Sequence, residues 1–214
     1  ENDSNTALSI DKIRARYAYK AEEISERTKK LYSGKPILKI NKLSTWFPLG
    51  GSLFSKQKGW VKAVNKVSFD VYPGETLGLV GESGCGKSTL GRSILRLIEP
   101  TSGGVNFENT DLLKLGKSDM RRMRRDIQII FKDPYSSLNP RLTVGDSLME
   151  PLQVHQLYDN NTRRKMRVLE LLERVNLPAE YFNRYPHEFS GGQRQRIVIA
   201  RALALQPKFI ICDE

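Results

Sequence analysis

Residues 81–89 read Gly81-Glu82-Ser83-Gly84-Cys85-Gly86-Lys87-Ser88-Thr89, and this stretch decides the fold class. It fits the pattern G-x-x-x-x-G-K-[S/T], in which glycines turn backbone N–H groups inward around a phosphate at the start of a helix. The almost wholly apolar residues 76–80 predict a preceding strand buried on both faces of a parallel sheet, and residues 90–98 predict the helix. We assign this whole phosphate loop to nucleotide binding, with Lys87 reaching the β and γ phosphates and Ser88 ligating Mg²⁺.

A second apolar strand, predicted at residues 209–213, ends in two carboxylates. This strand places Asp213 to hold Mg²⁺ through water and Glu214 beside the γ phosphate as a base for water, so Glu214 and Lys87 are the predicted catalytic residues. Neighbouring residues on a strand point to opposite faces, so the two carboxylates cannot share one role. The plainer alternatives are an exposed acidic strand end and a purely structural glycine loop, with Cys85 a bystander or a reactive thiol.

The string Ser190-Gly191-Gly192-Gln193, here called the Ser-Gly-Gly tip, opens another predicted helix. A helix that begins with Ser-Gly-Gly is a second anion-binding N-terminus, although one nucleotide already has its phosphate loop. Two such sites indicate two molecules. If two chains pair head to tail about a twofold axis, each tip closes over the γ phosphate held by the other chain's loop.

Composition narrows the class of protein. The chain has 214 residues, 39% of them hydrophobic and 28% charged, which is typical of a globular protein. No apolar run approaches the roughly 18 residues of a membrane-spanning helix, and no leader peptide is visible. The two cysteines indicate a reducing compartment. The net charge of +11 implies an anionic partner without choosing between nucleic acid, lipid and a phosphorylated ligand.

The rest of the chain divides near residue 37. Residues 1–36 are predicted to be a linker or a helical extension, and the missing initial Met suggests that the true N-terminus is absent. Two strands are predicted within residues 37–43 and 61–71, separated by a glycine-rich loop. Further strands are predicted at 105–107 and 127–131, and helices at 161–175, capped by Asn161, and at 197–205.

Taken together, these motifs resemble the nucleotide-binding subunit of an ATP-binding cassette (ABC) transporter over about residues 37–214. Residues 131–141 and 185–190 are similar to the ATPases of oligopeptide, dipeptide and nickel importers. The resemblance implies an α/β P-loop NTPase core with a mostly parallel sheet and flanking helices. It also implies an N-terminal antiparallel β region and a small α-helical subdomain at about 135–190. In this family the phosphate loop is the Walker A motif.

The resemblance also implies a function and partners. Such subunits bind and hydrolyse ATP with Mg²⁺ at the cytoplasmic face of the membrane, where they are peripheral. They pair as homodimers, heterodimers or fused double cassettes, and drive two transmembrane permease subunits fed by an extracytoplasmic solute-binding protein. Peptide uptake is therefore the expected function, with residues 135–149 facing the permease and no nucleic acid as partner.

Three features depart from the family pattern. Lys132 stands where the family has Gln, and a protonated Lys has no lone pair with which to ligate Mg²⁺. The family's switch His and later strands do not follow Glu214, so we expect a C-terminally truncated fragment that is inactive alone. For the aromatic residue that stacks on adenine, Trp60 is the first choice, with Phe54 or Trp46 behind it.

Two other functions stay open. A non-transport ABC ATPase acting on nucleic acid or ribosomes fits the positive charge, although the run Arg121-Arg122-Met123-Arg124-Arg125 has no interleaved aromatic residues and reads as a solvated helix end. A contact of this run with membrane headgroups or the permease is the alternative. A nucleotide-binding regulatory cassette with impaired hydrolysis is motivated by Lys132.

Overall fold

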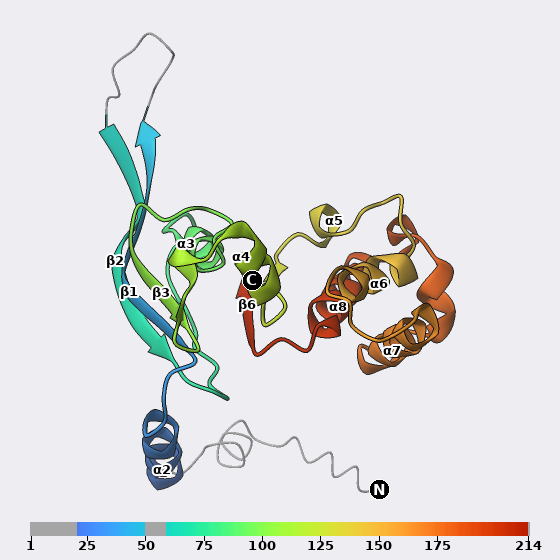
Figure 1. Ribbon diagram of the computed structural model, residues 1–214, viewed down its shortest axis with the longest axis horizontal. Coiled ribbons are helices and arrows are strands. Elements are labelled where there is room, and N and C mark those ends of the chain that lie inside the picture. Colours follow the sequence, from blue (N-terminus) through green and yellow to red (C-terminus); the bar gives the residue numbers. More distant parts are fainter. Residues whose placement is uncertain (1–20, 50–58, 214) are drawn as a thin grey trace, which may run out of the picture.

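The computed structural model describes residues 21–49 and 59–213 (Figure 1). Its strands are β1 (Leu38–Leu49), β2 (Gly59–Val71), β3 (Ser102–Phe107), β4 (Thr110–Asp111), β5 (Ile127–Phe131) and β6 (Phe209–Asp213). Its α-helices are α2 (Ala21–Tyr32), α3 (Lys87–Ile94), α4 (Lys117–Met123), α5 (Pro134–Ser137), α6 (Val144–Val154), α7 (Asn161–Arg174) and α8 (Gly191–Ala204). Its short 3₁₀ helices are η1 (Leu112–Lys114), η2 (Ala179–Asn183) and η3 (Pro186–Glu188).

A long hairpin builds an antiparallel sheet on one side of the molecule (Figure 1). β1 pairs with β2 on one edge and with β3 on the other, which gives the strand order β2-β1-β3-β4. At the start of β1, Leu38 and Ile40 are buried and Lys39 is exposed, so one face of the sheet covers a core. The predicted pair of strands around the glycine-rich loop is confirmed.

The strands β5 and β6 form a separate parallel pair, and the predicted metal ligand Asp213 is the last residue of β6. The two strands run in register from Ile127 opposite Phe209 to Phe131 opposite Asp213. A Cβ added at Gly91 of α3 would lie only 3.2 Å from Ile211 Cγ2 of β6, so α3 packs directly on this strand. Parallel strands end at the same edge, and Asp213 therefore lies next to the end of β5.

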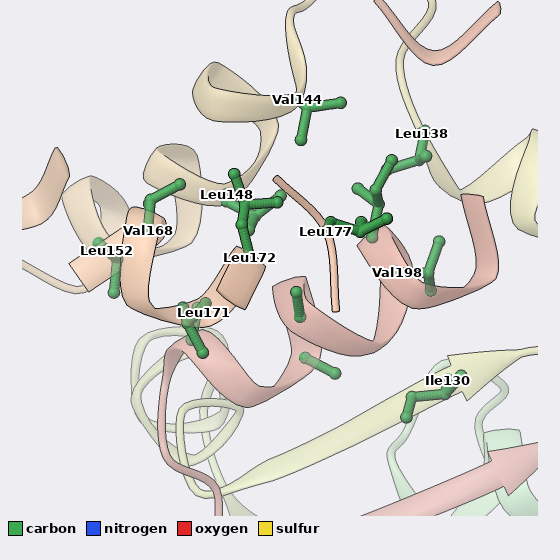
Figure 2. Close-up of a cluster of buried hydrophobic side chains, with 14 of the residues drawn as sticks. Ile130, Leu138, Val144, Leu148, Leu152, Val168, Leu171, Leu172, Leu177 and Val198 are labelled. Carbon is green, nitrogen blue, oxygen red and sulfur yellow. The ribbon is translucent and has the colours of Figure 1, made fainter. Parts of the chain in front are cut away.

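Two hydrophobic cores hold these elements. One lies between the antiparallel sheet, α3, η1 and α4, with Phe107 and Leu112 fully buried. The other joins α6, α7 and α8 to Ile130 of β5, and Figure 2 shows its leucine and valine side chains converging between the helices. Each leucine buried in this way contributes about 1.5–3 kcal/mol relative to an exposed one. β6 lies between the two groups of elements in Figure 1.

Side-chain caps fix where the helices of the second core begin. Thr143 Oγ1 accepts a hydrogen bond from Asp146 N at the start of α6. At α7 the cap is Asn160 and not the predicted Asn161, because Asn160 has the extended backbone of a cap and its Oδ1 accepts from Arg163 N at 2.9 Å. α8 begins at Gly191, directly after Ser190, as predicted for the Ser-Gly-Gly tip, and it contains most of the predicted helix 197–205.

The predicted buried strand at residues 76–80 is wrong. These residues form no strand, and Leu77, Leu79 and Val80 are exposed, Val80 to 95%. An apolar run becomes a buried strand only where neighbouring strands pair with it, and within the described residues β6 pairs with β5 alone. The run still leads directly into the phosphate loop.

Candidate nucleotide-binding site

The phosphate loop is seated against β2 through a glycine. Gly84 and Gly86 have φ angles of +81° and +100°, a region that residues with a Cβ rarely adopt. At Gly86 a Cβ would also lie 2.1 Å from the carbonyl oxygen of Ala63. Gly86 is the N-cap of α3 and offers no side chain, so the amides of the first turn have no side-chain cap of their own. The loop can therefore present these amides to an anion.

Lys87 folds back over the loop that precedes it. Its Nζ donates hydrogen bonds to the carbonyl oxygens of Gly81 at 2.7 Å and Glu82 at 2.8 Å, and it lies 3.8 Å from Cys85 Sγ. The ammonium group is thus fixed at the loop, next to the start of α3. The lysine charge and the helix dipole both favour a bound anion at this point.

Ser88 and Asp213 bring the two predicted anchors together. Ser88 Oγ donates a hydrogen bond of 2.6 Å to Asp213 Oδ1, although the two residues are 125 positions apart in the chain. The contact joins the first turn of α3 to the carboxyl end of β6. The pair that the sequence predicted as metal ligands is therefore in direct contact.

The chemistry of this pair fits Mg²⁺. A serine hydroxyl and a carboxylate are the hard oxygen donors that Mg²⁺ prefers, and Mg²⁺ in nucleotide sites usually takes one or two protein oxygens together with phosphate and water. No group of three or more His, Cys, Asp or Glu side chains that could hold a metal occurs in the described part of the chain. The arrangement therefore suits an ion that arrives with a nucleotide better than a fully protein-bound metal.

The Ser-Gly-Gly tip is formed by a reciprocal capping arrangement at the start of α8. Ser190 Oγ accepts from Gln193 N at 3.3 Å, and Gln193 Oε1 accepts from Ser190 N at 3.0 Å. Apart from the neighbouring residues and the backbone of α8 itself, a Cβ added at Gly191 or Gly192 would meet no atom of the described residues within 4 Å. The two glycines thus leave open space on the outside of the tip, where another molecule can approach the backbone closely.

The tip and the phosphate loop belong to different cores. α3 packs in the core under the antiparallel sheet, through Leu90 and Ile94. α8 packs in the helical core, through residues such as Ile197 and Ala200. Each core therefore holds one of the two helix starts that the sequence predicts to bind an anion.

The strand register of the hairpin shows on which face the tryptophans predicted to stack on adenine lie. Across β1 and β2, Trp46 pairs with Lys62 and Pro48 pairs with Trp60, so Trp46 and Trp60 share a face, with ring centroids 6.5 Å apart. Between the pairs Thr45–Val64 and Trp46–Lys62 the register skips one residue of β2, namely Ala63. The four residues of the pairs Trp46–Lys62 and Pro48–Trp60 therefore lie on one face of the hairpin, opposite the face of Thr45.

The opposite face of the hairpin is the one next to α3. Thr45 shares a buried hydrogen bond of 2.8 Å with Ser93 of α3. Phe47, two residues further along β1, is on the same face as Thr45 and is 39% exposed. Phe47 is therefore a further candidate for stacking on adenine, which sequence reasoning overlooked. The skipped residue on β2, which gives no signal in the sequence, turns Trp60 away from the face of Thr45.

Two predicted residues, Glu214 and Phe54, lie outside the described residues. Of the remaining ones, Lys132 is exposed and directly follows β5, at the same edge of the strand pair as Asp213. Cys85 and Cys212 are free and exposed. The basic run 121–125 lies at the C-terminal end of α4, where the helix dipole stabilises positive charge. Within this run, Arg122 forms an ion pair with Asp119.

A cavity of about 850 Å³ lies between α3, β5, α5, α6 and α8. Gln128, Ser136, Glu150, His155 and Arg201 are among its lining residues. Partial burial lowers the pKa of His155 below its ordinary value of 6.5, and the charges of Arg125 and Arg121 lower it further, while Asp126 opposes them.

Fold and geometry define a P-loop nucleotide-binding domain with a second glycine-containing helix start at α8. A family model described as "ABC transporter" matches residues 64–214, and the chain belongs to this family. No helix of the described residues is long and apolar enough to span a bilayer.

Named relatives agree with this family. The chain is 55% identical over 180 residues to a glutathione import ATP-binding protein GsiA of Pectobacterium atrosepticum, covering 84% of this chain and 29% of the relative. The Escherichia coli protein of the same name is 53% identical over 197 residues, covering 92% of this chain and 31% of the relative. The chain thus spans about a third of the length of these relatives.

A solved structure agrees as well. A dimeric ATP-binding cassette, MJ0796, in a post-hydrolysis state bound to ADP and Pi, matches with a TM-score of 0.73 and 30% identity, over 82% of this chain and 72% of that one. The likeness covers both the sheet and the helical core, and it confirms the predicted fold class.

Proposed function

We propose that this chain is an ATP-binding and ATP-hydrolysing part of an ABC transporter that takes up small peptides through membrane-embedded permease partners. The observation that carries the proposal is the 2.6 Å contact between Ser88 and Asp213. It brings together a phosphate-binding helix start and a carboxylate at a strand end, the two parts that a Mg²⁺–nucleotide site requires.

The phosphate loop does the binding. The amides at the start of α3 and the ammonium group of Lys87 would hold the phosphates, with Lys87 exchanging its carbonyl partners for phosphate oxygens. Ser88 and Asp213 would hold Mg²⁺, which supplies positive charge to the phosphate oxygens when it is bound. Glu214, the next residue after Asp213, would accept the proton of the attacking water.

The Ser-Gly-Gly tip would act on a nucleotide held by a second cassette. The open space outside Gly191 and Gly192 supports this role, since a phosphate of another molecule can approach the backbone there. The amides at the start of α8 would then favour the charge on the γ phosphate. The dimeric state of the structurally similar cassette supports the same arrangement.

The peptide class comes from the relatives. Two proteins at 53–55% identity are named glutathione import ATP-binding proteins, and glutathione is a small peptide. We propose permease subunits and an extracytoplasmic solute-binding protein as partners, and the cytoplasmic membrane face as the location. The cavity that contains Gln128 and Glu150, next to residues 135–149, is the proposed docking site of the permease. We also retain the division into an extension, 1–36, and an ATPase domain, 37–214, with a helical subdomain.

Turnover by the intact protein tests this proposal. The purified protein should hydrolyse ATP only with Mg²⁺, and Lys87→Ala should abolish turnover, whereas Lys165→Gln on the exposed side of α7 should not. Reconstituted with its permease, the protein should move a labelled small peptide in an ATP-dependent manner. Nucleotide-independent peptide uptake, or turnover that survives Lys87→Ala, would contradict the proposal.

Lys132 favours a second candidate, a nucleotide-binding regulatory cassette with impaired hydrolysis. An ammonium group at the end of β5 cannot ligate a metal as an amide oxygen does. In this case the intact protein binds ATP without turnover, and Lys132→Gln gains turnover. Equal, rapid turnover of both proteins would rule this candidate out.

A further inference from the structure

An arginine of α8 is stacked on an aromatic ring of α5. The guanidinium carbon of Arg194 lies 3.7 Å from the ring centroid of Tyr135. Arg194 is only 7% exposed, and its Nη1 has no hydrogen-bond partner within the described residues. A buried charge of this kind is costly unless other groups replace its hydration, and the face of an aromatic ring is one such group.

The same guanidinium holds the backbone just before the Ser-Gly-Gly tip. Arg194 Nε donates to the carbonyl oxygen of Phe189 at 2.8 Å, and Nη2 donates to the same oxygen. The backbone N–H of Arg194 donates to Ser190 O at 2.9 Å. Two successive carbonyl groups on the way into the tip are therefore bound by one residue, and the orientation of the tip depends on that residue.

Tyr135 itself belongs to a short segment that follows Lys132. Its backbone N–H is capped by Asp133 Oδ1 at 2.9 Å, and this bond is the main cause of the lowered pKa of Asp133. Further along α5, Arg201 Nη1 donates to Ser137 O at 2.8 Å. α5 is thus held by two residues of α8, Arg194 and Arg201, which lie about two helical turns apart along α8.

The ring of Tyr135 also faces outward. Tyr135 is 66% exposed although it contacts a buried guanidinium. Removing the ring would therefore open the guanidinium group of Arg194 to water.

We propose that Tyr135 is a positioning residue for the Ser-Gly-Gly tip, acting through Arg194. The proposal rests on the proposed function, in which the tip closes on a nucleotide held by a second cassette. Without the ring, Arg194 gains hydration by turning outward, which releases the Phe189 carbonyl group and loosens the start of α8. The phosphate loop belongs to the other core and is unaffected.

The test separates nucleotide binding from closure. Four variants of the intact protein are compared with the parent: Tyr135→Leu, Tyr135→Phe, Arg194→Lys and the double variant Tyr135→Leu/Arg194→Lys. Lys165→Gln is the matched control, because Lys165 also makes a cation–π contact. Its Nζ lies 5.0 Å from the ring centroid of Phe182, a residue outside the tip. A fluorescent ATP analogue reports binding at the phosphate loop, sedimentation reports MgATP-dependent association, and hydrogen exchange reports the amides of residues 190–193.

Tyr135→Leu should weaken MgATP-dependent association roughly tenfold and speed exchange at the tip, with analogue binding unchanged. Tyr135→Phe keeps the ring and should behave like the parent, as should Lys165→Gln. Arg194→Lys should match Tyr135→Leu, since lysine lacks the planar fork, and the double variant should be no worse than either single one.

Association and tip exchange unchanged in Tyr135→Leu would overturn the inference. Equal defects in Tyr135→Leu and Tyr135→Phe would also overturn it, since the ring would then not be the cause. A parent protein that binds no ATP analogue at all would overturn the proposed function and this inference with it, whereas normal closure in both parent and Tyr135→Leu would overturn this inference alone.

Discussion

The seat of the phosphate loop on β2 predicts a large difference between two glycine substitutions. Both Gly86→Ala and Gly84→Ala force a Cβ into a backbone conformation with positive φ, which costs about 1–2 kcal/mol. At Gly84 the new methyl group meets no atom within 4 Å in the described part of the chain, its two neighbouring residues aside. At Gly86 it would lie 2.1 Å from the Ala63 carbonyl oxygen, a backbone atom that cannot rotate away.

Forcing such an overlap adds about 1–3 kcal/mol of strain. Gly86→Ala should therefore lower the free energy of unfolding by about 2–5 kcal/mol, and Gly84→Ala by about 1–2 kcal/mol. The first value is a large part of the roughly 5–15 kcal/mol that stabilises a typical domain. Urea unfolding measures both losses of free energy, provided that the slope m against urea concentration is the same in parent and variants. Equal losses in the two variants would refute the seating of the loop against Ala63.

Three further predictions concern metal binding, adenine stacking and the pH dependence of stability. Ser88→Ala and Asp213→Asn should each raise the Mg²⁺ concentration needed for ATP binding about 10- to 100-fold in a titration, and an unchanged requirement would speak against the metal assignment. Phe47→Ala should weaken ATP affinity roughly 2- to 10-fold by calorimetry while Trp60→Ala does not, and the reverse result would restore Trp60 as the stacking residue. The folded pKa of His155 lies below its unfolded value of 6.5, so the unfolded chain binds the proton more readily and stability falls as pH drops through and below 6.5. His155→Gln should flatten the stability curve at and below pH 6.5, and an unaltered curve there would assign the dependence to other groups.

The local motifs of this chain could be predicted from its sequence because their geometry is encoded by consecutive residues. The phosphate loop needs glycines at fixed places, and Gly84 and Gly86 have the positive φ angles that the pattern requires. The start of α8 likewise follows from the spacing of Ser190 and Gln193, whose side chains cap each other's backbone. The contact between Ser88 and Asp213 is an exception, since the two residues are 125 positions apart, but a Mg²⁺–nucleotide site needs both a hydroxyl at the loop and a carboxylate at a strand end.

Features that depend on pairing between distant segments could not be predicted. The apolar residues 76–80 carry the composition of a strand, yet composition does not say which strand will pair with them. The skipped residue Ala63 changes which side chains of the hairpin face α3, and a shift of one residue reverses the face. The stacking of Arg194 on Tyr135 joins two motifs that the sequence presents as independent.

Nucleotide-dependent association tests the central claim, that two cassettes enclose MgATP between the phosphate loop of one and the Ser-Gly-Gly tip of the other. Sedimentation of the intact protein with Glu214→Ala, which removes the proposed base, should show a doubled mass at saturating MgATP and the single mass with ADP. A second variant, Gly192→Asp, should bind ATP at the phosphate loop and stay at the single mass, because a carboxylate at the tip repels the phosphate. A Glu214→Ala protein that binds MgATP and keeps the single mass would contradict the account.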